Sequence, residues 1–248
     1  MSAELHPPLK VIAHVRSDFP EKFGIPRQSG LAPDALSRVV FEEEYRNAEA
    51  LRGIEGFDYL WLIWEFSGNL RESWSPTVRP PRLGGNARLG VFATRSPFRP
   101  NPLGLSSVKL ERIENDPEHG LVLVISGADL MDGTPVYDIK PYIPYTDAHP
   151  DAAGGFASEP DSTLEVAFPD AYLRQIPEKK RSALLQVLAQ DPRPSYRADG
   201  ERVYGLYFAG FNIRFRVENA VLTVVGVKNE EVRMKNQSVG ENCPRRYG

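Results

Sequence analysis

Short strand-like segments dominate the first 150 residues, and helical segments almost never interrupt them. Each segment is rich in β-branched or aromatic residues and is bounded by turn-forming residues, which is typical of short strands. The predicted strands are Val11–Phe19, Arg38–Phe41, Tyr59–Phe66, Leu89–Arg95, Leu105–Ile113, Leu121–Ser126 and Val136–Ile143. A single helix is predicted among them, over Asn47–Arg52. A doubly wound α/β fold needs a helix after each strand, so the pattern favours an antiparallel barrel or sandwich, and we predict the barrel.

A second, smaller unit is predicted after residue 161. Residues 151–161 are mostly Asp, Ala, Gly, Pro and Ser, which indicates a linker. Over 162–230 we expect an α+β unit: a strand at Leu164–Phe168, a helix that starts at Pro177, and a strand meander. The predicted fold class is therefore mainly β, with an amino-terminal β-barrel over 1–150, this smaller α+β domain, and a polar tail over 231–248.

The composition favours a cytoplasmic protein. A single cysteine, Cys243, rules out an intramolecular disulfide and leaves no cysteine pair for zinc. No apolar segment is long enough to cross a membrane, and the start of the chain does not resemble an export signal. The four histidines are scattered without metal-like spacing, so we expect neither a metal site nor a membrane partner.

Positive charge is concentrated between residues 71 and 99. The whole chain has a formal net charge of −3, yet this segment holds six arginines and a single acid, Glu72. All six cations are arginine, whose planar guanidinium binds phosphate and carboxylate with two parallel hydrogen bonds. A solvated basic loop is the plainer alternative, but we favour an anion-recognition surface.

Three loop sequences combine glycines, prolines and polar side chains in ways that ordinary turns do not require. They begin at Gly24, Gly84 and Asp132, and each carries cations, amides or carboxylates suited to a ligand. Motifs of metalloproteases, serine hydrolases, dinucleotide-binding proteins and P-loop nucleotidases do not occur. We therefore expect a ligand site formed by loops rather than one of these common catalytic centres.

These loops carry a specific resemblance. The sequences PRQSG from Pro26, WSPTVRPPRLGGNARLGVFATRSPFRPNPLGLS from Trp74 and DGTPVYDIKPY from Asp132 resemble the TrmO family of tRNA methyltransferases, also called TsaA-like or YaeB-like proteins. The resemblance covers residues 8–155 closely. The segment from Asp191 to Arg197, with the meander after it, is similar to the same family's C-terminal domain.

The resemblance implies a β-barrel enzyme that binds S-adenosylmethionine, forms a homodimer, and acts on the anticodon loop of a threonine tRNA. The implied reaction is methylation of the exocyclic amino nitrogen of N6-threonylcarbamoyladenosine, which lies next to the anticodon. The implied cofactor-binding residues are Pro26, Arg27, Gln28, Ser67, Gly68, Arg95, Leu105, Asp132, Gly133, Thr134 and Pro135. Gln28 and Asp132 offer acceptors for the cofactor's amines, and Arg27 or Arg95 suits its carboxylate.

At one pair of positions the chain departs from the family pattern. The family places a His-Gln pair after the apolar strand, whereas this chain has Ser67-Gly68. This departure supports an alternative interpretation, in which the chain is a non-catalytic barrel protein that senses S-adenosylmethionine or binds RNA.

Methyl transfer to a weakly nucleophilic amine needs a nearby proton acceptor. Asp138 and Tyr142 are candidates, with Lys140 as a cation that lowers the pKa of either one, because all three share one strand face by period two. An internal salt bridge and a strand-face tyrosine are an equally good interpretation.

Candidate substrate-binding residues are cationic or aromatic. Arg82, Arg88 and Arg99 suit the threonyl carboxylate or tRNA phosphates, and Phe98 suits base stacking, although it could instead fill a dimer contact. In the second unit Arg193 and Arg197 suit phosphate contacts, with a rigid interdomain strut as the alternative.

Overall fold

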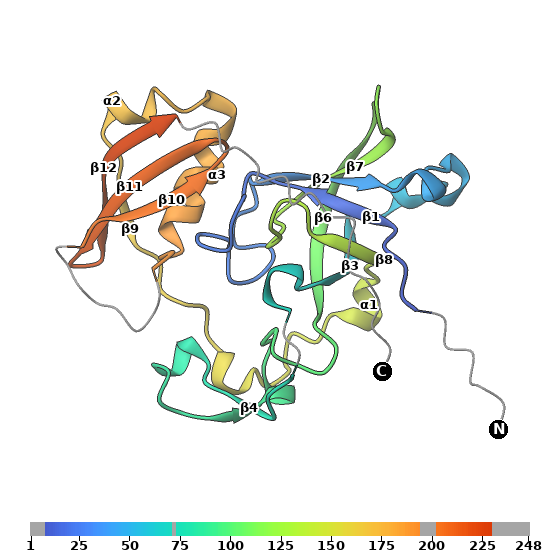
Figure 1. Cartoon of the computed structure of the whole chain (residues 1–248), viewed down its shortest axis with the longest axis horizontal. Coiled ribbons are helices and arrows are strands. Elements are labelled where there is room, and N and C mark those ends of the chain that lie inside the picture. The colour runs from blue at the N-terminus through green and yellow to red at the C-terminus, as the bar shows by residue number, and fades with distance from the viewer. Residues whose placement is uncertain (1–7, 71–72, 194–201, 230–248) are drawn as a thin grey trace, which may run out of the picture.

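The computed structural model describes residues 8–70, 73–193 and 202–229, and these residues form two separate β-sheet units and a small projecting hairpin (Figure 1). The mainly β class is confirmed. The predicted polar tail over 231–248 lies outside the described residues.

Six antiparallel strands of the amino-terminal half pair in the cyclic order β1-β2-β7-β6-β3-β8, and β8 pairs back to β1, so the sheet closes on itself as a barrel. The strands are β1 (Ala13–Arg16), β2 (Leu36–Phe41), β3 (Tyr59–Glu65), β6 (Leu103–Asp116), β7 (Gly120–Ser126) and β8 (Pro135–Pro141). Closure leaves no free sheet edge in this unit.

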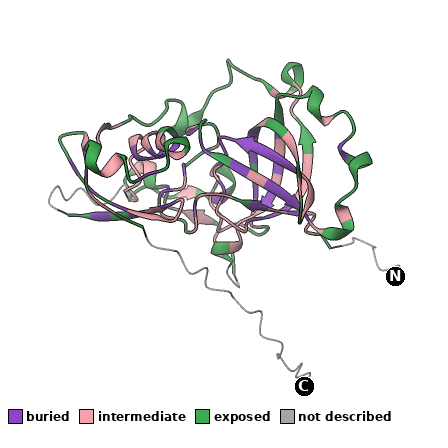
Figure 2. Ribbon diagram, turned by 90° about the horizontal axis from the view of Figure 1, so that it is seen from above, coloured by how far each residue is buried: buried purple, intermediate pink, exposed green. Residues whose placement is uncertain are grey.

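Alternation of side chains along β3 shows how a strand contributes to the barrel core. In β3 the even-numbered residues Leu60, Leu62 and Trp64 point inward and are buried, while Tyr59 on the other face is 45% exposed. The prediction that this strand is central is confirmed, because β3 pairs with both β6 and β8. Figure 2 shows buried residues concentrated along the barrel strands.

The helix predicted over Asn47–Arg52 is a 3₁₀ turn instead. The chain between β2 and β3 forms η1 (Glu43–Tyr45), η2 (Ala48–Leu51) and η3 (Ile54–Gly56). The Asn47 side chain caps η2 by accepting from the Glu49 N–H, and Gly53 then turns the chain at φ 86°. Short helical pieces that connect other elements often take this tighter 3₁₀ form.

The predicted strand Leu89–Arg95 is mostly wrong. The strand β5 covers only Leu89–Gly90, pairs with β4 (Thr77–Val78), and gives way to η6 (Val91–Ala93). The Thr94 hydroxyl and N–H both donate to the Val91 carbonyl, which turns the chain over a buried Val91 and leaves Phe92 in solvent. We name residues 73–102, which contain this hairpin and η5 (Pro81–Leu83), the arginine arm.

The carboxy-terminal unit has a sheet in the order β10-β11-β12-β9, formed by β9 (Glu165–Ala167), β10 (Tyr204–Phe208), β11 (Phe211–Glu218) and β12 (Val221–Asn229). The predicted strand, helix and meander are therefore confirmed. The helix α3 (Glu178–Ala189) buries Ala183, Leu184, Val187 and Leu188 against this sheet. Two short helices, α1 (Pro144–Asp147) and η7 (Gly155–Ala157), lie between β8 and β9, and α2 (Asp170–Leu173) follows β9 within the carboxy-terminal unit. Over the described ranges, no helix has the length and apolarity needed to span a bilayer.

One barrel segment belongs to the core of the carboxy-terminal unit. Residues 17–35, here named the amino-terminal loop, connect β1 to β2 and lie between the two units (Figure 1). Phe19, Ala32 and Ala35 are at most 2% exposed, because they pack with Leu184 and Leu206 of the carboxy-terminal unit. The two cores therefore do not divide at the predicted linker.

Candidate functional site

A cavity of about 380 Å³ opens at one end of the barrel. Its walls come from the amino-terminal loop, from the end of β3 with η4 (Ser67–Asn69), from the start of β6, from the arginine arm, and from the segment that joins β7 to β8. A volume of this size is typical of small-molecule sites.

Glycines bring the amino-terminal loop to this cavity. Gly24 and Gly30 have φ values of 91° and 83°, a region that other residues rarely adopt. The Gly30 N–H donates to the Gly127 carbonyl at 2.8 Å, and a Cβ on Gly127 would lie 3.2 Å from the Gly30 Cα. The close approach places Gln28 at the cavity wall, where its Oε1 accepts from the Arg95 guanidinium of the arginine arm.

The cavity floor is a chain of hydrogen bonds. Gly104 allows the Trp64 ring to lie flat on β6, since a Cβ there would be 2.2 Å from Trp64 Cε2. The Trp64 indole donates to Ser106 Oγ at 3.0 Å, and the Ser106 hydroxyl donates to Asp129 Oδ1 at 2.6 Å. Because indole is only a donor, the single hydroxyl proton of Ser106 is directed at Asp129.

Asp129 is partly buried, and burial raises the pKa of its carboxyl above the ordinary 3.8, against the opposing effect of the Ser106 hydrogen bond and the Arg95 charge. A second carboxylate, Glu65, also lines the cavity. Burial, followed by hydrogen bonding to Glu65 and its negative charge, raises the pKa of Tyr137. The cavity therefore presents two acceptors beside aromatic rings.

Lys22 enters the space that Gly68 leaves open. Its Nζ donates to the Gly68 carbonyl and, at 2.5 Å, to Asn69 Oδ1. A Cβ on Gly68 would lie 2.6 Å from Lys22 Cε, so the larger side chain of the family pattern would displace this lysine. The Ser67-Gly68 departure thus coincides with a cation at the cavity wall.

Arg27 lines the cavity and also contacts both the linker and the carboxy-terminal unit. Its guanidinium donates to Asp161 at 3.1 Å and to the carbonyls of Asp191 and Arg193, each at 3.4 Å. Arg82 pairs with the same Asp161 at 3.3 Å. The cavity wall is therefore tied to both neighbouring segments.

All the cofactor residues expected from the resemblance line the cavity except Asp132, Gly133 and Pro135. These three form the turn that fastens β8 to β1. Asp132 accepts from the Ser17 N–H at 3.0 Å and lies 3.8 Å from Arg16, while the Gly133 N–H donates to the Val15 carbonyl. Their contacts to ligand stay predictions.

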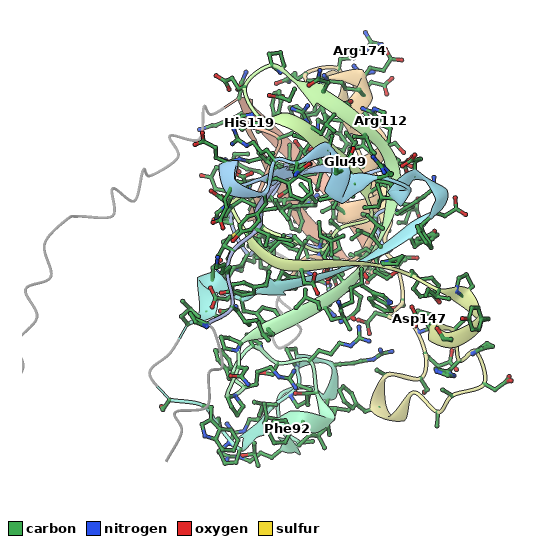
Figure 3. The ribbon with its side chains drawn as sticks, turned by 90° about the vertical axis from the view of Figure 1, so that its right-hand side faces the viewer. Glu49, Phe92, Arg112, His119, Asp147 and Arg174 are labelled. Atoms are coloured by element: carbon green, nitrogen blue, oxygen red, sulfur yellow. The ribbon has the colours of Figure 1, made fainter. Side chains whose placement is uncertain are left out.

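The three candidate catalytic residues do not line the cavity. Asp138 and Lys140 form an ion pair at 2.9 Å. Tyr142 packs on Trp61, a cavity residue, with ring centroids 5.5 Å apart. The Trp61 indole donates to Asp147 at 2.7 Å, and Figure 3 shows Asp147 on α1. Their catalytic role stays a prediction.

The candidate substrate residues are dispersed. Arg99 lines the cavity and Phe98 a smaller one beside it, while Arg88 lies in the arm and donates to Thr77 Oγ1 at 3.3 Å. Arg193 binds Asp191 through two hydrogen bonds of 2.8 Å, a contact that fits the strut alternative. Arg197 lies outside the described residues.

Several cavity residues have no counterpart in the sequence prediction: Lys22, Trp61, Trp64, Glu65 and Asp129. The sequence does mark Asp129 as a candidate, because it is an acidic residue that follows the apolar strand Leu121–Ser126 closely. The tryptophans and Glu65 resembled ordinary strand residues. Only the closed barrel shows that the end of β3, which carries these three residues, meets the start of β6 at the cavity.

Two family models match most of this chain. The model of the tRNA-methyltransferase O N-terminal domain matches residues 14–148, and that of the TrmO C-terminal domain matches residues 161–230. The chain belongs to the TrmO family.

Relatives and solved structures support this membership. The chain is 43% identical to an Escherichia coli tRNA (adenine(37)-N6)-methyltransferase over 226 residues, covering 88% of this chain and 96% of that protein. It is 51% identical to a protein of the same name from Eikenella corrodens, over 69% of this chain and 97% of that protein. The crystal structure of TrmO from Pseudomonas aeruginosa superimposes with a TM-score of 0.75 at 34% identity, covering 91% of this chain and all of that one.

Proposed function

We propose that this protein is an S-adenosylmethionine-dependent tRNA methyltransferase that methylates the exocyclic N6 nitrogen of adenine 37, the nucleoside next to the anticodon. Membership of the TrmO family and the names of the relatives support the reaction. The observation that carries it is the cavity, which joins aromatic rings, two carboxylates and cations at one end of the barrel. In line with the family resemblance, the preferred substrate is adenosine that carries a threonylcarbamoyl group, in threonine tRNA.

The chemistry of the cavity fits S-adenosylmethionine. Trp61 and Trp64 offer ring faces that suit a purine or a sulfonium cation. Arg95 and Lys22 suit the carboxylate of the methionine moiety, since Arg27 is engaged by Asp161. Gln28 adds an amide that can donate and accept. Bound cofactor supplies an activated methyl group, and the protein has to hold the amine in line with it.

We assign proton acceptance to Asp129. It is one of the two cavity carboxylates, and the Ser106 hydroxyl donates to its Oδ1, which fixes the carboxylate at the cavity as an acceptor for the adenine N6–H. A raised pKa brings the basicity of this carboxylate closer to neutrality, which makes a general base more effective. Asp138 and Tyr142 remain the alternative acceptors.

The remaining parts of the proposal concern assembly. We propose a cytoplasmic homodimer that covers the cavity rim, where Leu105 is 56% exposed. We also propose that residues 1–150 form the cofactor-binding domain, that 151–161 form the linker, and that the unit at 162–230 serves the tRNA. The names of the relatives do not favour a non-catalytic sensor.

The direct test is transfer of a labelled methyl group from S-adenosylmethionine to tRNA with and without the threonylcarbamoyl group. We expect label on adenine 37 and a strong preference for the modified tRNA. Asp129→Asn should lower kcat by about 10²- to 10⁴-fold. Asp138→Asn is the matched control and should stay near the wild-type rate. No label in any tRNA would contradict the proposed function, and the reverse order of the two variants would move the acceptor to Asp138.

A further inference from the structure

A second, smaller hollow lies beside the cofactor cavity. It has a volume of about 170 Å³, and its walls include Trp74, Phe98 and prolines of the arginine arm. Asn69 and Arg99 line both hollows, so a ligand in one lies next to a ligand in the other. We name the smaller hollow the aromatic pocket.

An exposed aromatic pair stands at this pocket. The rings of Trp74 and Phe92 are stacked, with centroids 6.2 Å apart and planes at 25°. Trp74 is 48% exposed and Phe92 is 73% exposed, which is unusual for rings of this size. Figure 3 shows Phe92 on the arm, at the end of the molecule away from Arg174. The pair adds little to the core, so its ring faces remain available to a partner.

The positive charge around the Trp74–Phe92 pair indicates an anionic partner. The segment 71–99 carries six arginines against one acid. Among the described residues, Arg82 is the arm's arginine in an ion pair, and Arg79, Arg88 and Arg99 have no carboxylate partner. Arg95 belongs to the cofactor cavity instead, where it donates to Gln28 and its charge acts on the Asp129 carboxyl. Exposed aromatic faces combined with unpaired arginines are typical of surfaces that bind single-stranded nucleic acid. A protein partner of matching charge would have to be strongly acidic, whereas a tRNA loop supplies both bases and phosphates.

We propose that the aromatic pocket holds one nucleobase of the tRNA loop that has left its stack in the RNA. This base stacks on the ring of Trp74, which Phe92 supports from its other side, while the unpaired arginines bind the phosphates on either side of the base. This inference rests on the proposed function, because it assumes an RNA loop at the cofactor cavity. The pocket lies outside that cavity, so the base it holds is a neighbour of the reacting adenosine. Arg99, between the two hollows, then lies close to both nucleotides.

Steady-state kinetics on tRNA test the pocket. Trp74→Ala should raise the KM for tRNA by about tenfold or more, because the loss of one base–aromatic stack is large enough for this effect. The KM for S-adenosylmethionine should not change. Trp74→Phe should restore most of the affinity, since it keeps a ring face. Phe57→Ala, which removes another exposed ring, at a site before β3, is the control and should behave as wild type.

Salt dependence separates stacking from charge. The slope of log affinity against log salt should be unchanged in Trp74→Ala and should become shallower by somewhat less than 1 in Arg88→Gln. An unchanged KM for tRNA in Trp74→Ala would overturn the proposal and leave the aromatic pair to a protein partner. A matching rise in the KM for S-adenosylmethionine would also overturn it, by placing Trp74 in the cofactor site. If the wild type transfers no methyl group to any tRNA, the proposed function itself fails.

Discussion

The amino-terminal loop and the arginine arm both extend from the barrel and both line the same cavity. They differ in packing: the loop is buried against a second unit, whereas the arm is exposed to solvent. The loop is buried against the carboxy-terminal unit, with Phe19 only 1% exposed and Asp18 paired to Lys180 of α3. The Asp34 N–H and carboxylate also exchange two hydrogen bonds with the Gln186 side chain, at 3.0 and 2.9 Å. In the arm, by contrast, β4 and β5 pair at two positions, and the Phe92 side chain is exposed to solvent.

The difference indicates a division of labour. A small, chemically constant cofactor is best bound by a preorganised wall, and packing of the loop into a second core supplies that rigidity. A large RNA loop needs an exposed surface that can adapt, and the arm keeps its rings and cations available for it. The carboxy-terminal unit therefore supports the cofactor site as well as adding surface, although it contributes no residue to the cavity lining.

Leu206→Ala should produce the largest effect on the loop. Leu206 is fully buried and touches the loop at Gly24, so its truncation should cost about 2–5 kcal/mol of unfolding free energy. We also expect weaker binding of S-adenosylmethionine by the folded variant, because the loop loses its support. Denaturation and calorimetry give the two quantities.

Leu123→Ala in β7 is the matched control for this variant, since Leu123 is equally buried but belongs to the barrel core. Leu123→Ala should lower the unfolding free energy about as much as Leu206→Ala does. It should leave the affinity of the folded protein for S-adenosylmethionine unchanged. Equal affinities in the two variants would remove the carboxy-terminal unit from the cofactor site.

Gly24→Ala should destabilise by about 1–3 kcal/mol through the clash alone, since its Cβ would fall 1.8 Å from Leu206 Cδ1 in a tightly packed core, and the strain of its positive φ adds to this. Gly30→Ala is the control: its φ is also positive, but nothing lies within 4 Å, so only backbone strain of about 1–2 kcal/mol remains. In the double variant with Leu206→Ala, the cost of Gly24→Ala should shrink, because the truncated side chain makes room. Additive costs would mean that the two residues are not in contact.

Asp129→Asn should change the pH dependence of stability at the cavity floor. Because burial raises the pKa of Asp129, the folded state binds more protons than the unfolded chain between 3.8 and the folded pKa. The unfolding free energy of the wild type therefore falls as pH rises through this window. The variant lacks this fall, so its stability relative to wild type should grow from pH 4 to pH 7, while its activity is lost. Urea denaturation at both pH values measures this, and a variant whose unfolding free energy falls relative to that of the wild type between pH 4 and pH 7 would contradict it.

Trp74→Ala should have the smallest effect on folding. Half-exposed in the arm, Trp74 contributes little to the core, and we expect a change within about 0.5 kcal/mol in unfolding free energy. Thermal denaturation checks this. A loss comparable to that of Leu206→Ala would show that the arm is held by packing after all, and the contrast between the two regions would disappear.

Local sequence patterns decided the strands and part of the site. The apolar runs of β3 and β7, the meander of the carboxy-terminal unit, and a helix starting after Pro177 all follow from interactions between residues close in sequence. The glycines at 24, 30 and 104 and the arginines of the arm were also visible as unusual loops. Their composition was enough to predict a ligand site, and the resemblance to the TrmO family implied its chemistry.

Long-range packing decided the rest. The sequence could not show that Ser106 on β6 and Asp129, in the segment after β7, hydrogen-bond at 2.6 Å, because the pairing of β6 with β7 brings these segments together. Nor could it show that the loop after β1 completes the core of a unit that begins only at residue 162. Hydrophobic burial is non-directional and depends only on which surfaces meet, so local patterns mark a residue as apolar without naming its partner. The predicted strand Leu89–Arg95 failed for the same reason: its β-branched and aromatic composition suited a strand, but only a two-pair ladder and a buried Val91 determined where the chain turned.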